Sequence, residues 1–126
     1  MTKKLITIAL IIFFLSPSWA QEGSYYASGL DKFRKGVELF EKEKYASARN
    51  VFEDFIEHDS KEQKKLTSDA YYYRALCAME LFNNDAEYLL TNFMDKFPES
   101  QRIKELYFVM GNFQYRKKKY SKANNK

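Results

Sequence analysis

The sequence is poor in the residues that usually carry chemistry or interrupt helices. It has one cysteine, two prolines and one histidine among 126 residues. A single cysteine excludes an internal disulfide, and a single histidine, His58, is too little for a typical zinc site. No glycine-rich phosphate loop, nucleophile elbow or paired-cysteine motif occurs. The residues therefore predict no enzyme, no cofactor and no metal site.

The remaining candidates for chemistry have structural explanations. Acidic residues between 38 and 54 recur at helical spacing among basic ones, as on a solvated helix face. Cys77 stands in an apolar stretch, where a buried cysteine is expected rather than a reactive thiol. His58 stands at the end of a predicted helix, where we expect a surface residue.

The first 20 residues have the layout of a secretory signal peptide. Lys3 and Lys4 precede an apolar run over 5–15, and small residues lead to a predicted cleavage point after Ala20. The run is too short for a membrane-spanning helix, which needs roughly 20 apolar residues. No lipid-anchor cysteine follows, because position 21 is Gln21. We therefore expect export, and for a bacterial protein a place in the periplasm or at the outer-membrane periphery.

Charge does not favour a nucleic-acid partner. Without Lys3 and Lys4, the formal net charge falls from +4 to about +2, with both signs interspersed. One basic segment stands out, namely Arg116, Lys117, Lys118, Lys119, Lys122 and Lys126. Each such residue near an anionic membrane would contribute about 1 kcal/mol. Basic residues also complement the C-terminal end of a helix dipole, which is the interpretation that we favour, while membrane contact stays open.

Three sets of residues recur with a period close to 38. The complete sets are Gly36, Tyr45, Ala48 and Gly111, Tyr120, Ala123, and a looser copy has Ala75 and Ala86. The spacings between Gly36, Ala75 and Gly111 are 39 and 36 residues. The spacings between Ala48, Ala86 and Ala123 are 38 and 37 residues. Such a period on helical patterning is typical of stacked helix pairs.

Apolar residues at helical spacing predict an all-α fold of about five helices. The expected divisions are a flexible lead-in at 21–29, repeats near 30–60, 68–100 and 103–123, and a tail at 124–126. We expect a capping box at 60–63, capping of the fourth helix by 83–85, and Ser100 as the N-cap of the fifth. The fifth helix should end near Lys119, and Tyr120 should open a sixth that the sequence leaves incomplete.

These residues resemble the tetratricopeptide repeat family over roughly 30–123. The small residue of the family's first helix matches Gly36, Ala75 and Gly111. The aromatic residue that opens the second helix matches Tyr45 and Tyr120, and the Ala-x-x-x-Phe motif matches Ala48 with Phe52. The proline after the second helix matches Pro98. The resemblance implies a right-handed superhelical array of antiparallel helix pairs with an incomplete third repeat. Asn84, Ser60 and the long spacings depart from the family pattern, which leaves the curvature open.

Segment 93–107 is similar to cell-envelope members of this family, including the outer-membrane assembly component BamD and the Tol-Pal coordinators. The first part of large exported Bacteroidetes-type repeat proteins is an equally good match. The resemblance implies a non-enzymatic scaffold that binds another envelope protein, as a peptide or a helix, in a concave groove. Carried over residue by residue, the groove would contain Phe33, Val37, Phe40, Glu41, Tyr72, Leu76, Met79, Glu80, Phe108, Asn112, Tyr115 and Arg116.

About half of these groove residues are expected to serve packing instead. Glu80, Asn112, Tyr115 and Arg116 are the stronger candidates, since polar groups in a groove have less reason to be core. Two alternatives stay open. The uncovered last helix could drive self-association as a homo-oligomer, or the chain could be the front part of a longer array.

Overall fold

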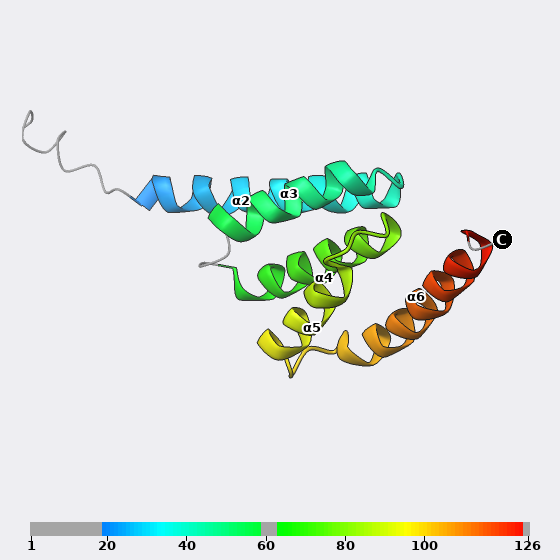
Figure 1. Cartoon of the computed structure of the whole chain (residues 1–126). Coiled ribbons are helices and arrows are strands. Elements are labelled where there is room, and N and C mark those ends of the chain that lie inside the picture. Colours follow the sequence, from blue (N-terminus) through cyan, green and yellow to red (C-terminus); the bar gives the residue numbers. More distant parts are fainter. Residues whose placement is uncertain (1–18, 59–62, 125–126) are drawn as a thin grey trace, which may run out of the picture.

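The computed structural model describes residues 19–58 and 63–124, with side chains from residue 27 onward (Figure 1). This part of the chain is all-helical and contains no strand, which confirms the predicted fold class. Its helices are α2 (Trp19–Glu41), α3 (Tyr45–His58), α4 (Lys64–Glu80), α5 (Ala86–Lys96) and α6 (Ile103–Asn124). Most of the predicted signal peptide and most of the predicted capping box at 60–63 lie outside the described residues.

Segment 21–29, expected as a flexible lead-in, is helical in the structure, because α2 already begins at Trp19. Segment 21–29 contains no proline. Extending an existing helix costs far less than nucleating one, so the amphipathic part beyond Leu30 can carry the helix backward.

Helices α2 and α4 end in the same way. At the end of α2, the N–H of Lys44 donates to the carbonyl of Leu39, and the N–H of Glu43 donates to Phe40. Glu43 has a φ of 57°, the left-handed conformation that this Schellman cap requires. The end of α4 repeats the pattern at Phe82, with φ 53°, 39 residues later.

Each cap turns the chain directly into the next helix. The connections 42–44 and 81–85 are short, and the helices on either side pack closely, α2 on α3 and α4 on α5. Figure 1 shows α2 and α3 lying alongside each other, with α4 next to them. The predicted antiparallel pairing of neighbouring helices is therefore present in both pairs.

Two clusters of buried side chains hold the helices together. The first joins α2, α3 and α4 through Phe33, Ala48, Phe52, Phe55, Ala70 and Cys77. The second joins α4, α5 and α6 through Tyr72, Ala75, Ala78, Met79, Ala86, Leu89, Leu90, Phe93, Leu106 and Phe113. Both clusters draw on α4, whose residues are buried on several sides, as its nearly continuous apolar sequence predicts.

Helix α6 differs from its sequence prediction at its C-terminal end. It continues through Tyr120 to Asn124, so no turn precedes Tyr120 and the expected start of a sixth helix is wrong. The segment 114–123 is rich in lysine, arginine and glutamine, which are good helix formers, and contains neither glycine nor proline. The motif Gly111, Tyr120, Ala123 repeats in sequence but not in structure.

Candidate functional site

Helices α4 and α6 face each other along a seam that is bridged by ion pairs at two points. Asp69 of α4 accepts a hydrogen bond from Arg102 Nε at 2.7 Å, just before α6 begins. Further along both helices, Arg116 of α6 donates to the carboxylate of Glu80 at 3.2 and 3.3 Å. The order of these contacts means that α4 and α6 run in the same direction. We call this region the α4–α6 seam.

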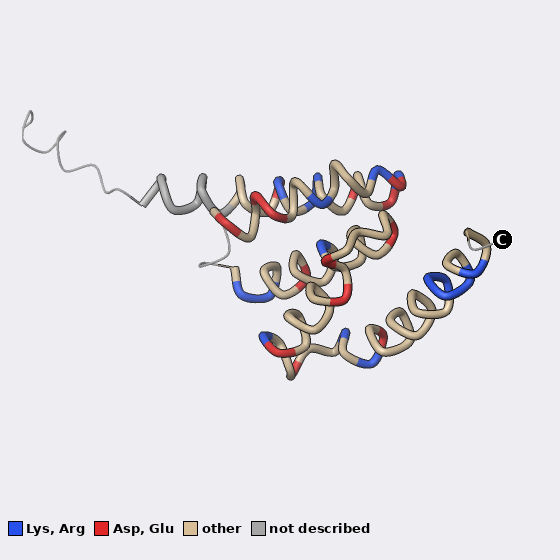
Figure 2. Tube along the Cα trace, viewed as in Figure 1, with Lys and Arg blue, Asp and Glu red and all other residues tan. Residues whose placement is uncertain are grey.

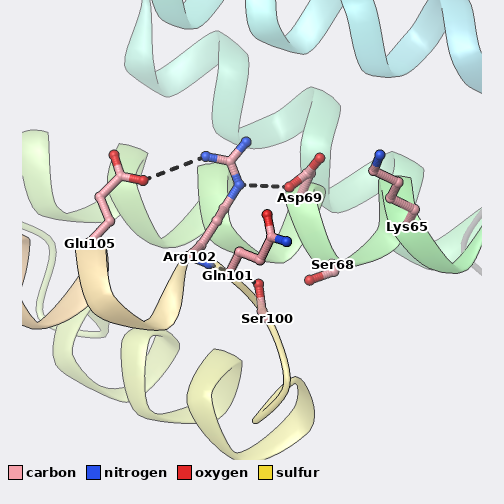
Figure 3. Close-up of a pocket in the computed structure, with 7 residues that line it drawn as sticks. All are labelled: Lys65, Ser68, Asp69, Ser100, Gln101, Arg102 and Glu105. Atoms are coloured by element: carbon pink, nitrogen blue, oxygen red, sulfur yellow. Dashed lines mark hydrogen bonds and ion pairs between the residues drawn. The ribbon is translucent and has the colours of Figure 1, made fainter.

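The first hollow in the seam has a volume of about 490 Å³. Its lining is polar and comes from both sides of the seam: Lys65, Ser68, Asp69, Ser100, Gln101, Arg102 and Glu105. Figure 3 shows the Arg102 side chain between Asp69 and Glu105, with Lys65 further along α4. The hollow therefore presents groups of both charge signs within a short distance.

Arg102 is held in place from several directions. Its guanidinium lies 4.6 Å from the centre of the Tyr72 ring, a cation–π contact. Burial lowers the pKa of Arg102, but the hydrogen bond and charge of Asp69 outweigh this and raise it. The predicted N-cap Ser100 contributes as well, because its Oγ accepts a hydrogen bond from the backbone N–H of Arg102 at 3.3 Å. These contacts make Arg102 a rigid donor group.

The second hollow lies further along α6 and has a volume of about 290 Å³. Its lining is Met79, Glu80, Val109, Asn112, Phe113, Tyr115 and Arg116. The guanidinium of Arg116 lies 4.8 Å from the centre of the Phe82 ring while it pairs with Glu80. Tyr115 is 71% exposed, so its ring forms an open wall of the hollow.

The four stronger groove candidates from the sequence are thus brought together. Glu80, Asn112, Tyr115 and Arg116 all line the second hollow. Met79 lies there too, although it is almost fully buried. These side chains come from one face of α4 and one face of α6, as the repeat pattern predicts.

Other groove candidates lie elsewhere. Phe33 is packed between Phe52 and Phe55, with ring centres 5.8 Å apart in each case, so its prediction as a groove residue is wrong. Tyr72 is 2% exposed and packs against Phe93, so its prediction is also wrong. Both are large rings on a helix that is covered on more than one side, where burial is the stronger driving force.

The remaining groove candidates lie outside both hollows. Val37 and Phe40 pack against the first cluster, and Leu76 packs against the second. Glu41 is exposed at the end of α2. Phe108 is 71% exposed and lines neither hollow.

Among the repeat-packing candidates, those of the first two repeats behave as predicted. Ala48, Phe52, Ala75 and Ala86 are fully buried, Gly36 faces the Phe52 ring, and Tyr45 packs against Phe40. Pro98 stands exposed in the connection between α5 and α6, where a helix-ending residue is expected.

The third repeat does not follow the prediction. Gly111 is exposed, and a Cβ there would meet nothing within 4 Å, so its assignment as a close-packing residue is wrong. Ala123 is also exposed. Tyr120 is 60% exposed, although its ring does touch Phe82 at 5.2 Å. The reason is that no described helix packs on that side of α6.

No sequence pattern predicts the ionic contacts that link helices distant in the chain. Arg49 of α3 binds Asp85 through both guanidinium ends, at 3.1 and 2.7 Å, and also contacts Glu53 at 2.9 Å. Asp85 stands at the N-cap position of α5, yet its carboxylate makes no capping bond and pairs with Arg49 instead. The Asp69–Arg102 pair was likewise not predicted. Neither pair has a local sequence signal, because each joins residues more than 30 positions apart.

The single histidine lies at the surface, and the single cysteine lies in the core. Nδ1 of His58 lies 3.0 Å from the Asp54 carboxylate, at the surface. Cys77 is fully buried, and burial raises the pKa of its thiol to about 12. No three metal-binding side chains gather in the ranges whose side chains are described, 27–58 and 63–124. In the same ranges no helix has the length and apolar character to cross a bilayer.

Burial, together with the hydrogen bond and the charge of Glu105, raises the pKa of the Tyr72 hydroxyl to about 12. Tyr72 therefore stays protonated at neutral pH and interacts with the Glu105 carboxylate at the edge of the first hollow. Together the two hollows offer guanidinium donors, carboxylate acceptors and an exposed aromatic ring, which suit the recognition of a polar chain.

Comparisons with protein-family models, with curated proteins and with solved structures find no match for this chain.

Proposed function

We propose that this protein is an exported, non-enzymatic scaffold of the tetratricopeptide type that binds an extended segment of another cell-envelope protein along the α4–α6 seam. The main support for this proposal is the pair of hollows, each of which contains an arginine paired with a carboxylate of α4. Preorganised charged donors of this kind lose little entropy when they bind a partner.

The dimensions of the seam support an extended ligand. Asp69 and Glu80 are separated on α4 by a length of about 16 Å, at 1.5 Å per helical residue. About five residues of an extended chain cover that distance. A peptide with a polar or charged group near each end could therefore engage both hollows at once.

The tetratricopeptide assignment has two supports. The small residues Gly36 and Ala75 lie at matching places in α2 and α4, and the caps at Glu43 and Phe82 have the same spacing of 39 residues. The superhelical arrangement and its handedness remain part of the proposal, as does export. The support for export is the basic, apolar and small-residue layout of 1–20.

Binding in the seam can be tested with phage-displayed random peptides selected on the purified chain. Asn112→Trp places an indole in the second hollow and should weaken the selected peptides by about tenfold or more. Asn50→Trp is the matched control, because Asn50 is also an exposed helical asparagine but lies on α3. Peptides that bind the Asn112→Trp variant as tightly as the original chain would contradict the assignment.

A charge swap sharpens the same test. The double variant Glu80→Arg with Arg116→Glu keeps an ion pair in the seam but reverses its direction, so the fold should survive while the preferred peptide charge pattern changes. Circular dichroism checks that the helical content is retained. If this variant selects peptides with the same charge pattern as the original chain, the bound peptide does not contact the pair of Glu80 and Arg116.

Export is tested separately by expressing the full sequence in a bacterium and sequencing the N-terminus of the accumulated protein. We expect the mature chain to start at Gln21 in the periplasmic fraction. An uncleaved chain in the cytoplasm would remove the envelope part of the proposal and leave the binding seam as it stands.

A further inference from the structure

Helix α6 carries a second exposed surface, on the side opposite its buried residues Leu106 and Phe113. Its members recur at intervals of three and four residues and so form one stripe along the helix. They are Lys104, Phe108, Gly111, Tyr115, Lys118 and Lys122, all exposed, and we call this stripe the α6 outer face. Phe108 and Tyr115 are each 71% exposed, which is unusual for aromatic residues on a helix.

A gap lies between the two aromatic side chains. Gly111 stands between Phe108 and Tyr115, and the space where its side chain would be is open for at least 4 Å. A helix that crosses here could bring its backbone close to α6, with its own side chains between the two rings. The shape of the outer face therefore suits a helix better than a flat surface.

The charge of this face is one-sided. Figure 2 shows blue bands and no red along the second half of α6. Arg116 and Lys117 are paired with Glu80 and Glu87. Within the described ranges, by contrast, no ion pair neutralises Lys118, Lys119 or Lys122. The end of the outer face is thus a cluster of uncompensated cations.

We propose that the α6 outer face binds an amphipathic helix of a partner protein that carries a small or apolar strip at its centre and carboxylates at the end that faces Lys118 and Lys122. Complementary charge fixes the orientation of such a helix and speeds the encounter. This surface shares Tyr115 with the second hollow, but its other members line neither hollow of the α4–α6 seam. The inference therefore does not depend on the peptide proposed to bind there.

A second copy of the chain fits this face less well. Antiparallel pairing of two α6 helices around Gly111 places Lys118 of one copy opposite Lys104 of the other, and parallel pairing places Lys122 opposite Lys122. Both arrangements bring like charges together, which is unfavourable. An anionic membrane fits less well because the centre of the face is a glycine and offers little apolar surface for insertion.

The test uses a yeast-displayed library of amphipathic helices, with a fixed apolar strip and flanking positions randomised among Glu, Lys, Gln and Ala, selected on the purified chain. We expect enrichment of helices with Glu near one end. Gly111→Leu fills the gap without disturbing the described packing and should weaken these helices by about tenfold or more. The double variant Lys118→Glu with Lys122→Glu should lose them and select Lys-rich helices instead.

Matched controls separate this face from general charge effects. Lys44→Glu with Lys64→Glu makes the same charge change at exposed positions outside α6 and should leave binding within about twofold. Asn112→Trp, which blocks the seam, should also leave binding unchanged, so failure here and failure of the seam proposal are distinguishable.

Several results would overturn the inference. These are enrichment of basic or neutral helices, no helix above background, or binding that Gly111→Leu does not weaken. A dimer in light scattering that Gly111→Leu dissociates would assign the face to a second copy. Binding to vesicles of anionic phospholipid that this variant abolishes would assign it to a membrane.

Discussion

Gly36 faces the ring of Phe52 so closely that a Cβ at position 36 would stand 2.7 Å from Phe52 Cε1. The ring has no free direction in which to move. It is fully buried, stacks on Tyr73 at 5.3 Å and touches Phe33 edge-on at 5.8 Å. Helices α2 and α3 therefore approach each other at a point where only glycine fits.

The substitution Gly36→Ala should destabilise the protein by about 1–3 kcal/mol, as overpacking of a dense core does. Gly111→Ala is the matched comparison, because both glycines lie inside helices but only Gly36 has a close neighbour. There we expect stabilisation by up to about 1 kcal/mol, from the higher helix propensity of alanine. Chemical denaturation followed by circular dichroism measures both, and equal effects at the two sites would contradict the described packing.

The caps of α2 and α4 make a second prediction. Glu43 is exposed and has a φ of 57°, so Glu43→Gly should relieve backbone strain and stabilise the protein by about 0.5–1 kcal/mol. Phe82→Gly relieves the same strain but removes a ring that touches Phe113 and Tyr120. We expect a net loss of about 2 kcal/mol. Stabilisation by both glycines would mean that Phe82 does not hold α6.

We expect the ion pair of Arg49 and Asp85 to stabilise the fold in a way that depends on pH. The hydrogen bond from Arg49 holds the pKa of Asp85 below its usual value, although partial burial opposes this. A carboxyl with a lowered folded-state pKa stabilises the fold above its unfolded pKa of about 4, and this contribution is lost as the pH falls through the folded pKa.

The variant Asp85→Asn should therefore be less stable than the original chain near neutral pH, by about 1 kcal/mol, since Asp85 is 43% exposed and solvent screens the pair. The difference should shrink toward zero in strong acid. Urea denaturation across the pH range provides the measurement, with Asp95→Asn, an exposed position on α5, as the control. A difference that stays constant with pH would exclude titration of Asp85 as its source.

We expect the Cys77 thiol to react slowly in the folded protein. Because burial raises the pKa of its thiol to about 12 and no solvent reaches it, Ellman's reagent should react with the folded protein only as fast as the protein opens. In denaturant the same thiol should react at once. Rapid labelling of the folded chain would place Cys77 outside the core that joins α3 and α4.

The parts of the fold that the sequence predicted are those with a local cause. The apolar stripe of Ala48, Phe52 and Phe55 predicts an amphipathic helix, and these residues are fully buried. The sequence period also placed Glu80 and Arg116 at matching positions of α4 and α6, and they line the same hollow. Their mutual pairing needs only that the two helices run in the same direction.

The parts that could not be predicted depend on distant neighbours. A glycine pattern looks the same whether a ring lies against it, as at Gly36, or nothing does, as at Gly111. The caps at Glu43 and Phe82 lack the glycine that usually marks a left-handed residue. Phe33 and Tyr72 were expected in the groove because helical spacing alone does not say how many sides of a helix are covered.

The way in which α6 is attached has a consequence for its dynamics. Its backbone comes near the other helices at few points, and beside the buried Leu106 and Phe113 it is held by the ion pairs of Arg102, Arg116 and Lys117. Exposed ionic links weaken as salt rises, whereas the aromatic core of α2, α3 and α4 does not. The last helix should therefore open as a separate unit, at a free energy that falls as the ionic strength rises, while the first three helices stay closed.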